Sequence, residues 1–327
     1  MRWRRISFVL AVLAGASLVG PLAGATTSRA PGRARAGVPA FSHVFVVVME
    51  NLGYAGAIAV PGFARLAARY ASATRYYAFG HPSLPNYLDL TSGSSWGIAS
   101  DCPTCYVAAP NVASQLQAAH VSWGAYMEGV PSPCWLAPYG PGGYAGKHDP
   151  FAYYLAIRDS RAACSHIRPL PDLYRALAGP AAAVPRFVWV TPNLCHDGHD
   201  CPPSVAAAWL DGFVGRVVAS AAWRHRGVLF VTWDEANGDS SGVGASGRVT
   251  AGGGGGRVLT LVIAPGVPAG LRVGAVYDHD SLLATVEDAF GLPLLNGARR
   301  AAPLTAFFQA RRTPARAGAR PARRARA

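Results

Sequence analysis

Five short apolar segments recur along the chain without alternating polar positions, at residues 41–51, 121–127, 186–191, 227–233 and 257–264. Runs of this kind, many of them β-branched, are typical of strands buried on both faces of a parallel sheet. Segments that favour helices lie between or after them, at residues 61–73, 111–120, 204–221 and 281–290. This pattern predicts an α/β fold built on a mostly parallel sheet.

Two of these apolar segments end abruptly in carboxylates. Glu50 and Asn51 end the first segment, and Asp234 and Glu235 follow the fourth. Ligands of such sheets bind at the carboxyl ends of the strands, where these side chains are expected to meet. Acids at adjacent strand ends repel each other unless a cation neutralises them. Glu50 alone could simply begin a solvated loop, and it is the second acidic strand end that favours a functional site.

Ser83 lies in a turn flanked by Pro82 and Pro85, just before an expected helix. The positive end of a helix stabilises an oxyanion or a bound phosphate. Ser83 is therefore our candidate nucleophile. The alternative is that it only caps the helix, which is a common role for serine.

Two further loops carry titratable side chains. Residues 192–201 place four of them within a short segment, and imidazole beside carboxylate at this density suits a metal ion, with Asp197 and His199 as candidate ligands. A merely polar loop closed by a disulfide is the alternative. Lys147, the single lysine of the chain, precedes His148 in a Gly-rich loop and could contact a phosphate or protonate a leaving group. A solvated loop charge is the alternative for this pair.

The net charge of +13 is concentrated at the two ends of the chain. Arginines of residues 1–40 and 301–327 account for all of it, so residues 41–300 are neutral overall. A neutral central region argues against a nucleic-acid-binding domain. The arginine-rich, aperiodic tail at 301–327 is expected to be disordered and could attach weakly to an anionic cell surface.

The N-terminus has the pattern of a secretory signal peptide, with basic residues, an apolar stretch and a small-residue cleavage site after Ala25. The expected division is a signal peptide at 1–25, a linker at 26–40, one catalytic domain at 41–300 and the tail at 301–327. An uncleaved membrane anchor is the alternative. Six cysteines in an exported chain favour disulfides. Proximity favours three pairs among the fifteen possible connectivities: Cys102 with Cys105, Cys134 with Cys164, and Cys195 with Cys201.

Six ordered motifs resemble those of one bacterial family. They are MEN, HPSLPNYLDLTSG, KHDPF, TPNLCHDGHD, VTWDE and the segment 279–293, within residues 41–295. The chain is similar to the bacterial phosphoesterases that group secreted acid phosphatases with phospholipases C. This resemblance implies a three-layer α/β/α sandwich of the alkaline-phosphatase-like type.

The resemblance also implies roles for individual side chains. Ser83 would become phosphorylated, and Asn86 would donate to a phosphoryl oxygen. Glu50, Asn51, Asp234 and Glu235 would hold a divalent metal of unknown identity. A second metal, or the substrate, would contact Asp197, His199 and His279. Cys195 and His196 stand where related sequences often have an acid and an asparagine, and this departure weakens the case for a second metal site.

These expectations describe a secreted, metal-dependent phosphomonoesterase that acts on a phosphorylated small molecule or lipid. One alternative is a phosphodiesterase of the phospholipase C type. The other is a non-catalytic binding protein of the cell surface that keeps this fold.

Overall fold

A single mixed sheet organises residues 37–309, the part of the chain that our computed structural model describes. Its nine strands run in the order β10-β2-β9-β6-β1-β5-β3-β4, with β11 beside β2. β9 is antiparallel to β2 and β6, and the other pairings are parallel, which confirms the mostly parallel sheet. The strands are β1 (His43–Met49), β2 (Ala71–Tyr77), β3 (Trp123–Met127), β4 (Ile167–Pro169), β5 (Phe187–Thr191), β6 (Gly227–Trp233), β9 (Arg257–Ile263), β10 (Arg272–Val273) and β11 (Tyr277–Asp278).

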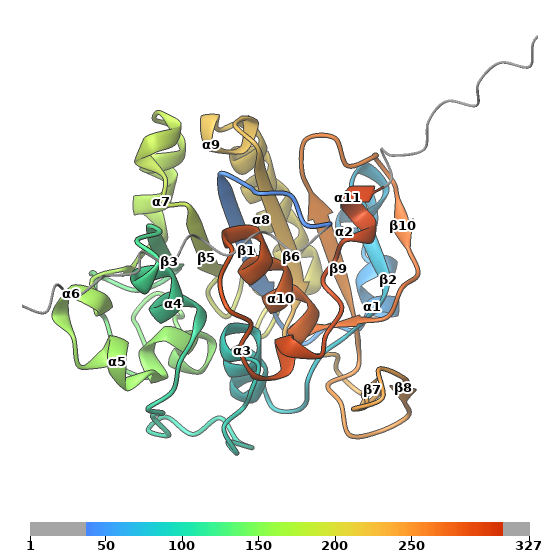
Figure 1. Cartoon of the computed structure of the whole chain (residues 1–327), viewed down its shortest axis with the longest axis horizontal. Helices are drawn as coiled ribbons and strands as arrows, with labels where there is room; N and C mark the ends of the chain where they lie inside the picture. Colours follow the sequence, from blue (N-terminus) through green and yellow to red (C-terminus); the bar gives the residue numbers. More distant parts are fainter. Residues whose placement is uncertain (1–36, 310–327) are drawn as a thin grey trace, which may run out of the picture. The chain divides into compact units, whose positions relative to one another are not determined.

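Helices cover both faces of this sheet, which confirms the three-layer arrangement. Figure 1 shows α3, α4 and α10 in front of the sheet, with α8 behind it. α2 and α7 pack against α8. The main helices are α1 (Tyr54–Ala59), α2 (Pro61–Arg69), α3 (Ser83–Ser92), α4 (Val112–Ala118), α7 (Leu170–Leu177), α8 (Pro203–Ala219) and α10 (His279–Phe290). Shorter ones are α5 (Leu155–Arg158), α6 (Arg161–Cys164), α9 (Ala221–Arg224) and α11 (Ala306–Gln309).

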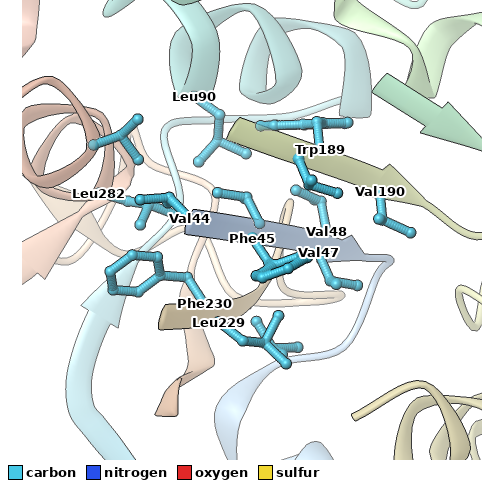
Figure 2. Packing of buried hydrophobic residues seen from close by; sticks show 14 of the residues in the cluster. Val44, Phe45, Val47, Val48, Leu90, Trp189, Val190, Leu229, Phe230 and Leu282 are labelled. Carbon is cyan, nitrogen blue, oxygen red and sulfur yellow. The ribbon is translucent and has the colours of Figure 1, made fainter. Parts of the chain in front are cut away.

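The core is centred on β1, whose seven residues are all buried. β1 lies between β5 and β6 and pairs in parallel with both. Figure 2 shows Leu90 of α3 and Leu282 of α10 against this part of the sheet, near Val44 and Trp189. Because α3 packs on the strands that carry the acidic ends, its position relative to those ends is fixed by the core.

All five predicted strands are present, and the main difference lies at residues 61–73. The helical pattern there predicted one helix, but α2 ends at Arg69 and β2 begins at Ala71. β2 is held by long-range pairing with β9, β10 and β11, which a local pattern does not reveal. The Gly-rich segment 237–256 contains a small hairpin of β7 (Gly242–Val243) and β8 (Val249–Thr250).

The three expected disulfides are confirmed, joining Cys102 to Cys105, Cys134 to Cys164 and Cys195 to Cys201. The predicted signal peptide at 1–25, most of the linker and residues 310–327 of the tail lie outside the described residues. Within residues 37–309, no helix is long and apolar enough to cross a bilayer.

Candidate active site

The carboxylates of two neighbouring strands meet at one edge of the sheet. The last residues of β1 and β6, Met49 and Trp233, are partners in the ladder, so Glu50 and Asp234 follow at the same level. Both side chains are fully or almost fully buried, and Glu235 is 7% exposed. The sheet therefore brings the two acidic strand ends together, as expected.

Asp234 is held by backbone groups through one oxygen only. Its Oδ1 accepts the N–H groups of Asn51, at 3.2 Å, and of Glu235, at 2.6 Å. Asn51 can aim its N–H at this oxygen because it adopts a left-handed backbone with φ of 55°. The Oδ2 atom is buried, accepts no hydrogen bond and lies near the Glu50 carboxylate. Burial, together with the charges of Glu50 and Glu235, raises the pKa of Asp234 well above its usual value.

Ser83 is the first residue of α3 and points its hydroxyl at Glu50. Its Oγ donates to Glu50 Oε2 at 3.2 Å, and the side chain is 2% exposed. The position before the helix belongs to Pro82, and no side chain caps this end of α3. Ser83 therefore does not have the capping role that was its alternative, and its hydroxyl lies between the helix end and the carboxylates.

Asn86 lies one turn further along α3 and ties the preceding loop to the site. Its Nδ2 donates to the Gly80 carbonyl at 2.8 Å and approaches Glu235 Oε2 at 3.4 Å. Its Oδ1 accepts the Gly80 N–H at 2.9 Å. His81, on the same loop, binds Glu235 Oε2 through Nδ1 at 2.7 Å. Asn86 and His81 thus fix Glu235 beside the start of α3.

His148 lies between Glu50 and Asp197 and contacts both carboxylates. Its Nε2 is 3.0 Å from Glu50 Oε1, and its Nδ1 is 3.3 Å from Asp197 Oδ2. Tyr87 donates to the same Glu50 oxygen at 2.9 Å and stacks on the imidazole with ring centres 5.2 Å apart. Burial opposes charge on His148, but Glu50 and Asp197 outweigh it and raise the pKa of His148 to about 9. The imidazolium and the Tyr87 hydroxyl in turn hold the pKa of Glu50 below its usual value, although burial opposes this.

Lys147 is joined to the start of α3 through Asp101, a residue not predicted from the sequence. Asp101 Oδ2 accepts from Lys147 Nζ at 3.0 Å, and Asp101 Oδ1 accepts the Leu84 N–H at 2.9 Å. Lys147 Nζ is also 3.3 Å from His199 Nε2. Lys147 therefore lies at the outer side of this group of side chains and is paired with Asp101.

The remaining predicted residues lie in two different places. Asp197 is buried beside His148, and its Oδ1 accepts the His199 N–H at 2.7 Å. His279 lies on the other side of β6, where Nε2 donates to the Asp234 carbonyl at 2.7 Å and Nδ1 accepts from the Tyr76 hydroxyl at 3.2 Å. Burial lowers the pKa of His279 to about 4, so the ring is neutral. With both ring nitrogens engaged, His279 positions the Asp234 backbone in this structure.

The site includes four residues that the sequence analysis did not identify: His81, Tyr87, Asp101 and Tyr76. His81 and Tyr87 lie within the HPSLPNYLDLTSG motif, which was a usable signal. Asp101 and Tyr76 have no local signal, since each reaches the site through contacts with distant segments.

The carboxylates at the ends of β1 and β6 have the chemistry of a metal site but not its finished geometry. In residues 37–309, no three side chains of His, Cys, Asp or Glu are already grouped to hold one. The donor chemistry nevertheless fits a divalent cation, because Asp234 Oδ2 is buried without a hydrogen bond beside two further carboxylates. A cation bound there would remove the repulsion that raises the pKa of Asp234.

The pairing of His148 predicts a pH dependence of stability. Its folded-state pKa of about 9 lies above the ordinary 6.5, so the pairing stabilises the fold fully below pH 6.5 and is lost as pH rises to 9. We expect the free energy of unfolding, measured with a chelator present, to lose about 3 kcal/mol over this range. His148→Gln should remove this part of the decline. An equal decline in the free energy of unfolding of the wild type and of His148→Gln would refute the assignment of this pH dependence to His148.

Comparisons with known proteins identify the family of this chain. The model of the phosphoesterase family matches residues 41–293. A relative named phosphatidylinositol-3-phosphatase, from Mycobacterium tuberculosis, is 30% identical over 91% of this chain and 92% of its own length. A phosphate-repressible acid phosphatase of Penicillium chrysogenum is 25% identical over 78% of this chain, which spans only 60% of that relative.

Solved structures support the fold. A protein of the alkaline phosphatase superfamily from Vibrio parahaemolyticus matches with a TM-score of 0.51 and 12% identity, over 80% of this chain and 72% of its own. Murine ectonucleotide pyrophosphatase/phosphodiesterase 5 matches with a TM-score of 0.50 and 12% identity, over 78% of this chain and 96% of its own. The chain belongs to the phosphoesterase family and is a phosphoric ester hydrolase with an alkaline-phosphatase-like fold.

Proposed function

We propose that this protein is a secreted, metal-dependent phosphomonoesterase that acts through a phosphoserine at Ser83. The contact that carries this proposal is the 3.2 Å hydrogen bond from Ser83 Oγ to Glu50 Oε2, at the positive end of α3. Activation of a serine requires an adjacent base, and stabilisation of a transferring phosphoryl group requires positive charge. Both requirements are met where α3 begins.

The metal would be held by Glu50, Asn51, Asp234 and Glu235, as the family resemblance implies. When bound, a divalent cation supplies charge neutralisation for the phosphoryl group and lowers the pKa of a coordinated hydroxyl. Asp197 and His199 would serve a second metal or contact the substrate. His279 is assigned a positioning role, because its two nitrogens bind the Asp234 carbonyl and the Tyr76 hydroxyl.

The reaction would proceed in two displacements at phosphorus. Ser83 Oγ attacks as its proton passes to Glu50 Oε2, and the bond from phosphorus to the leaving oxygen breaks. Lys147, at the outer side of the site, gives a proton to that oxygen. Water then attacks phosphorus and gives a proton to Lys147, the bond from phosphorus to Ser83 Oγ breaks, and Glu50 returns its proton to Ser83 as phosphate leaves. Asn86 and the first turn of α3 orient the phosphoryl oxygens.

Secretion is supported by two observations. All six cysteines are joined in disulfides, which persist in oxidising compartments. The first 25 residues also have the pattern of a signal peptide. A phosphorylated lipid is one candidate substrate class, since the 30% identical relative is named for a phosphoinositide.

The first experiment compares hydrolysis of p-nitrophenyl phosphate and bis-p-nitrophenyl phosphate by the mature protein, with and without a chelator. We expect cleavage of the monoester, loss of activity on chelation, and recovery when a divalent metal is returned. Preferential cleavage of the diester would instead support the phospholipase C type. Absence of turnover with every divalent metal would refute the proposal and support the non-catalytic alternative.

A further inference from the structure

Two cavities flank the start of α3, and they differ in chemical character. The acidic cavity, of about 890 Å³, is lined by Asp89, Asp278 and Asp280, by the basic side chain of Arg300, and by Phe79. The tyrosine cavity, of about 300 Å³, is lined by Asp101, Tyr139, Lys147, Tyr153, Leu194 and His199 among others. Ser83 itself lines neither cavity, so the contacts of its neighbours decide which cavity could receive the leaving group of a phosphate ester bound at Ser83.

The tyrosine cavity is connected to the reacting serine by a short series of contacts. Asp101 accepts the N–H of Leu84, which follows Ser83 directly. Lys147 pairs with Asp101, and the next residue, His148, contacts Glu50. Lys147 is also the proposed donor to the leaving oxygen, so the group attached to that oxygen would enter the cavity that Lys147 lines.

Tyr139 presents an exposed ring from a fixed backbone. Its side chain is 72% exposed, the largest value among the exposed large hydrophobic residues at 37–309. Its carbonyl accepts from Trp135 Nε1 at 3.0 Å, and it pairs with Ala145 in an isolated bridge. The neighbouring Gly146 N–H donates to the Pro138 carbonyl at 2.7 Å. Tyr139 therefore offers the tyrosine cavity an aromatic face on a backbone whose position is fixed.

Tyr153 forms a second, buried wall of the tyrosine cavity. Its side chain is 3% exposed, and its ring packs on that of Tyr106 with centres 6.0 Å apart. Its hydroxyl makes no hydrogen bond within residues 37–309, and it is not one of the fully buried polar atoms of this part of the chain. Because Tyr153 lines the cavity, this hydroxyl is open to a molecule that binds there.

The two cavities differ in the charge of their linings. In the tyrosine cavity Lys147 is paired with Asp101, and His199 contacts Asp200, so the lining is close to neutral. The acidic cavity instead holds buried Asp89 with an oxygen that accepts no hydrogen bond, and repulsion from Asp280 adds to burial in raising the pKa of Asp89. A neutral, flat, apolar leaving group is better matched by the tyrosine cavity.

We propose that the tyrosine cavity is the leaving-group subsite and binds an aromatic ring that is esterified directly to phosphate, with Tyr139 as the specificity-determining residue. The substrate class would then be aryl phosphomonoesters, a small phenol phosphate or a phosphotyrosine side chain. This inference rests on the proposed function, because it places the phosphoryl group at Ser83.

The test measures binding of phosphonates, which the enzyme does not hydrolyse, by calorimetry on the mature protein in a buffer containing Mn²⁺. We expect phenylphosphonate to bind about tenfold more tightly than methylphosphonate. Tyr139→Ala should abolish this preference, and Tyr139→Phe should keep it. Phe79→Ala, which removes the exposed ring of the acidic cavity, is the matched control and should leave the preference unchanged.

Two results would overturn the inference: no preference for the phenyl compound in the wild type, or loss of the preference in Phe79→Ala instead of Tyr139→Ala. These results do not depend on turnover, because no phosphate is transferred to or from a phosphonate. Absence of turnover in the hydrolysis experiment would refute the proposed function separately. A peptide carrying phosphonomethylphenylalanine, used as a third ligand, distinguishes the two sources of the ring. Tighter binding than phenylphosphonate supports a protein side chain, and weaker binding supports a small phenol.

Discussion

Ser83→Ala is expected to lower kcat for p-nitrophenyl phosphate by at least about a thousandfold. Within residues 37–309, the Ser83 hydroxyl is the only serine or threonine hydroxyl that donates to Glu50, Asp234 or Glu235. Water at the same place would have to attack without the fixed position that α3 gives to Ser83. Metal content, measured on the purified variant, should stay unchanged, because alanine removes none of the proposed ligands.

A second helix-terminal serine provides the matched control. Ser160 is a true cap of α6, where its side chain accepts the Ala163 N–H. Ser160→Ala should cost about 1 kcal/mol of stability and leave kcat unchanged. Ser83→Ala should show the reverse, with near-normal stability and almost no turnover. A Ser83→Ala enzyme that retains more than about one per cent of wild-type kcat would rule out the nucleophile assignment.

The sequence predicted the parts of the site that local patterns determine. β1 and β6 are unbroken apolar runs that stop at an acid, so Glu50 and Asp234 could be placed at one edge before the strand order was known. Their adjacency also follows from the parallel pairing of these strands. Ser83 could be placed because prolines flank its turn. These signals are short-range consequences of burial and backbone restriction.

The parts that escaped prediction depend on contacts between distant segments. Tyr87 contacts Glu50, 37 positions away in the chain, and Asp101 contacts Lys147, 46 positions away. β2 looked like the continuation of α2 because its small and aromatic residues suit either element, and only the pairing with β9 makes it a strand. The contact between Tyr76 on β2 and one nitrogen of His279 depends on the same long-range pairing and has no local signal in the sequence.

Asp234→Asn is expected to change activity and stability in opposite directions. Asparagine keeps an Oδ1 that can accept the Asn51 and Glu235 N–H groups, and its amide can donate to Glu50 where Oδ2 now accepts nothing. The substitution removes one buried negative charge next to Glu50 and Glu235. In a chelator, the variant should be more stable than the wild type by about 1 kcal/mol, a rise in melting temperature of about 2–4 °C.

The same substitution should remove the response to metal. A divalent ion at a hundred times its Kd stabilises a folded protein by about 2.7 kcal/mol. We expect added Mn²⁺ to raise the melting temperature of the wild type and to leave Asp234→Asn nearly unchanged, with kcat/KM lowered by at least about a thousandfold. Asp211→Asn, at an exposed position of α8, is the control and should alter none of these quantities.

The sign of the stability change in chelator separates two explanations of the buried carboxylates. If Asp234→Asn is less stable than the wild type there, the protein itself stabilises the charge of Asp234, and a cation is not needed to explain the cluster. If it is more stable, the folded chain carries a repulsion that a bound cation would relieve. A site retained for catalysis is expected to destabilise the fold in this way, because catalysis requires like charges to lie close together.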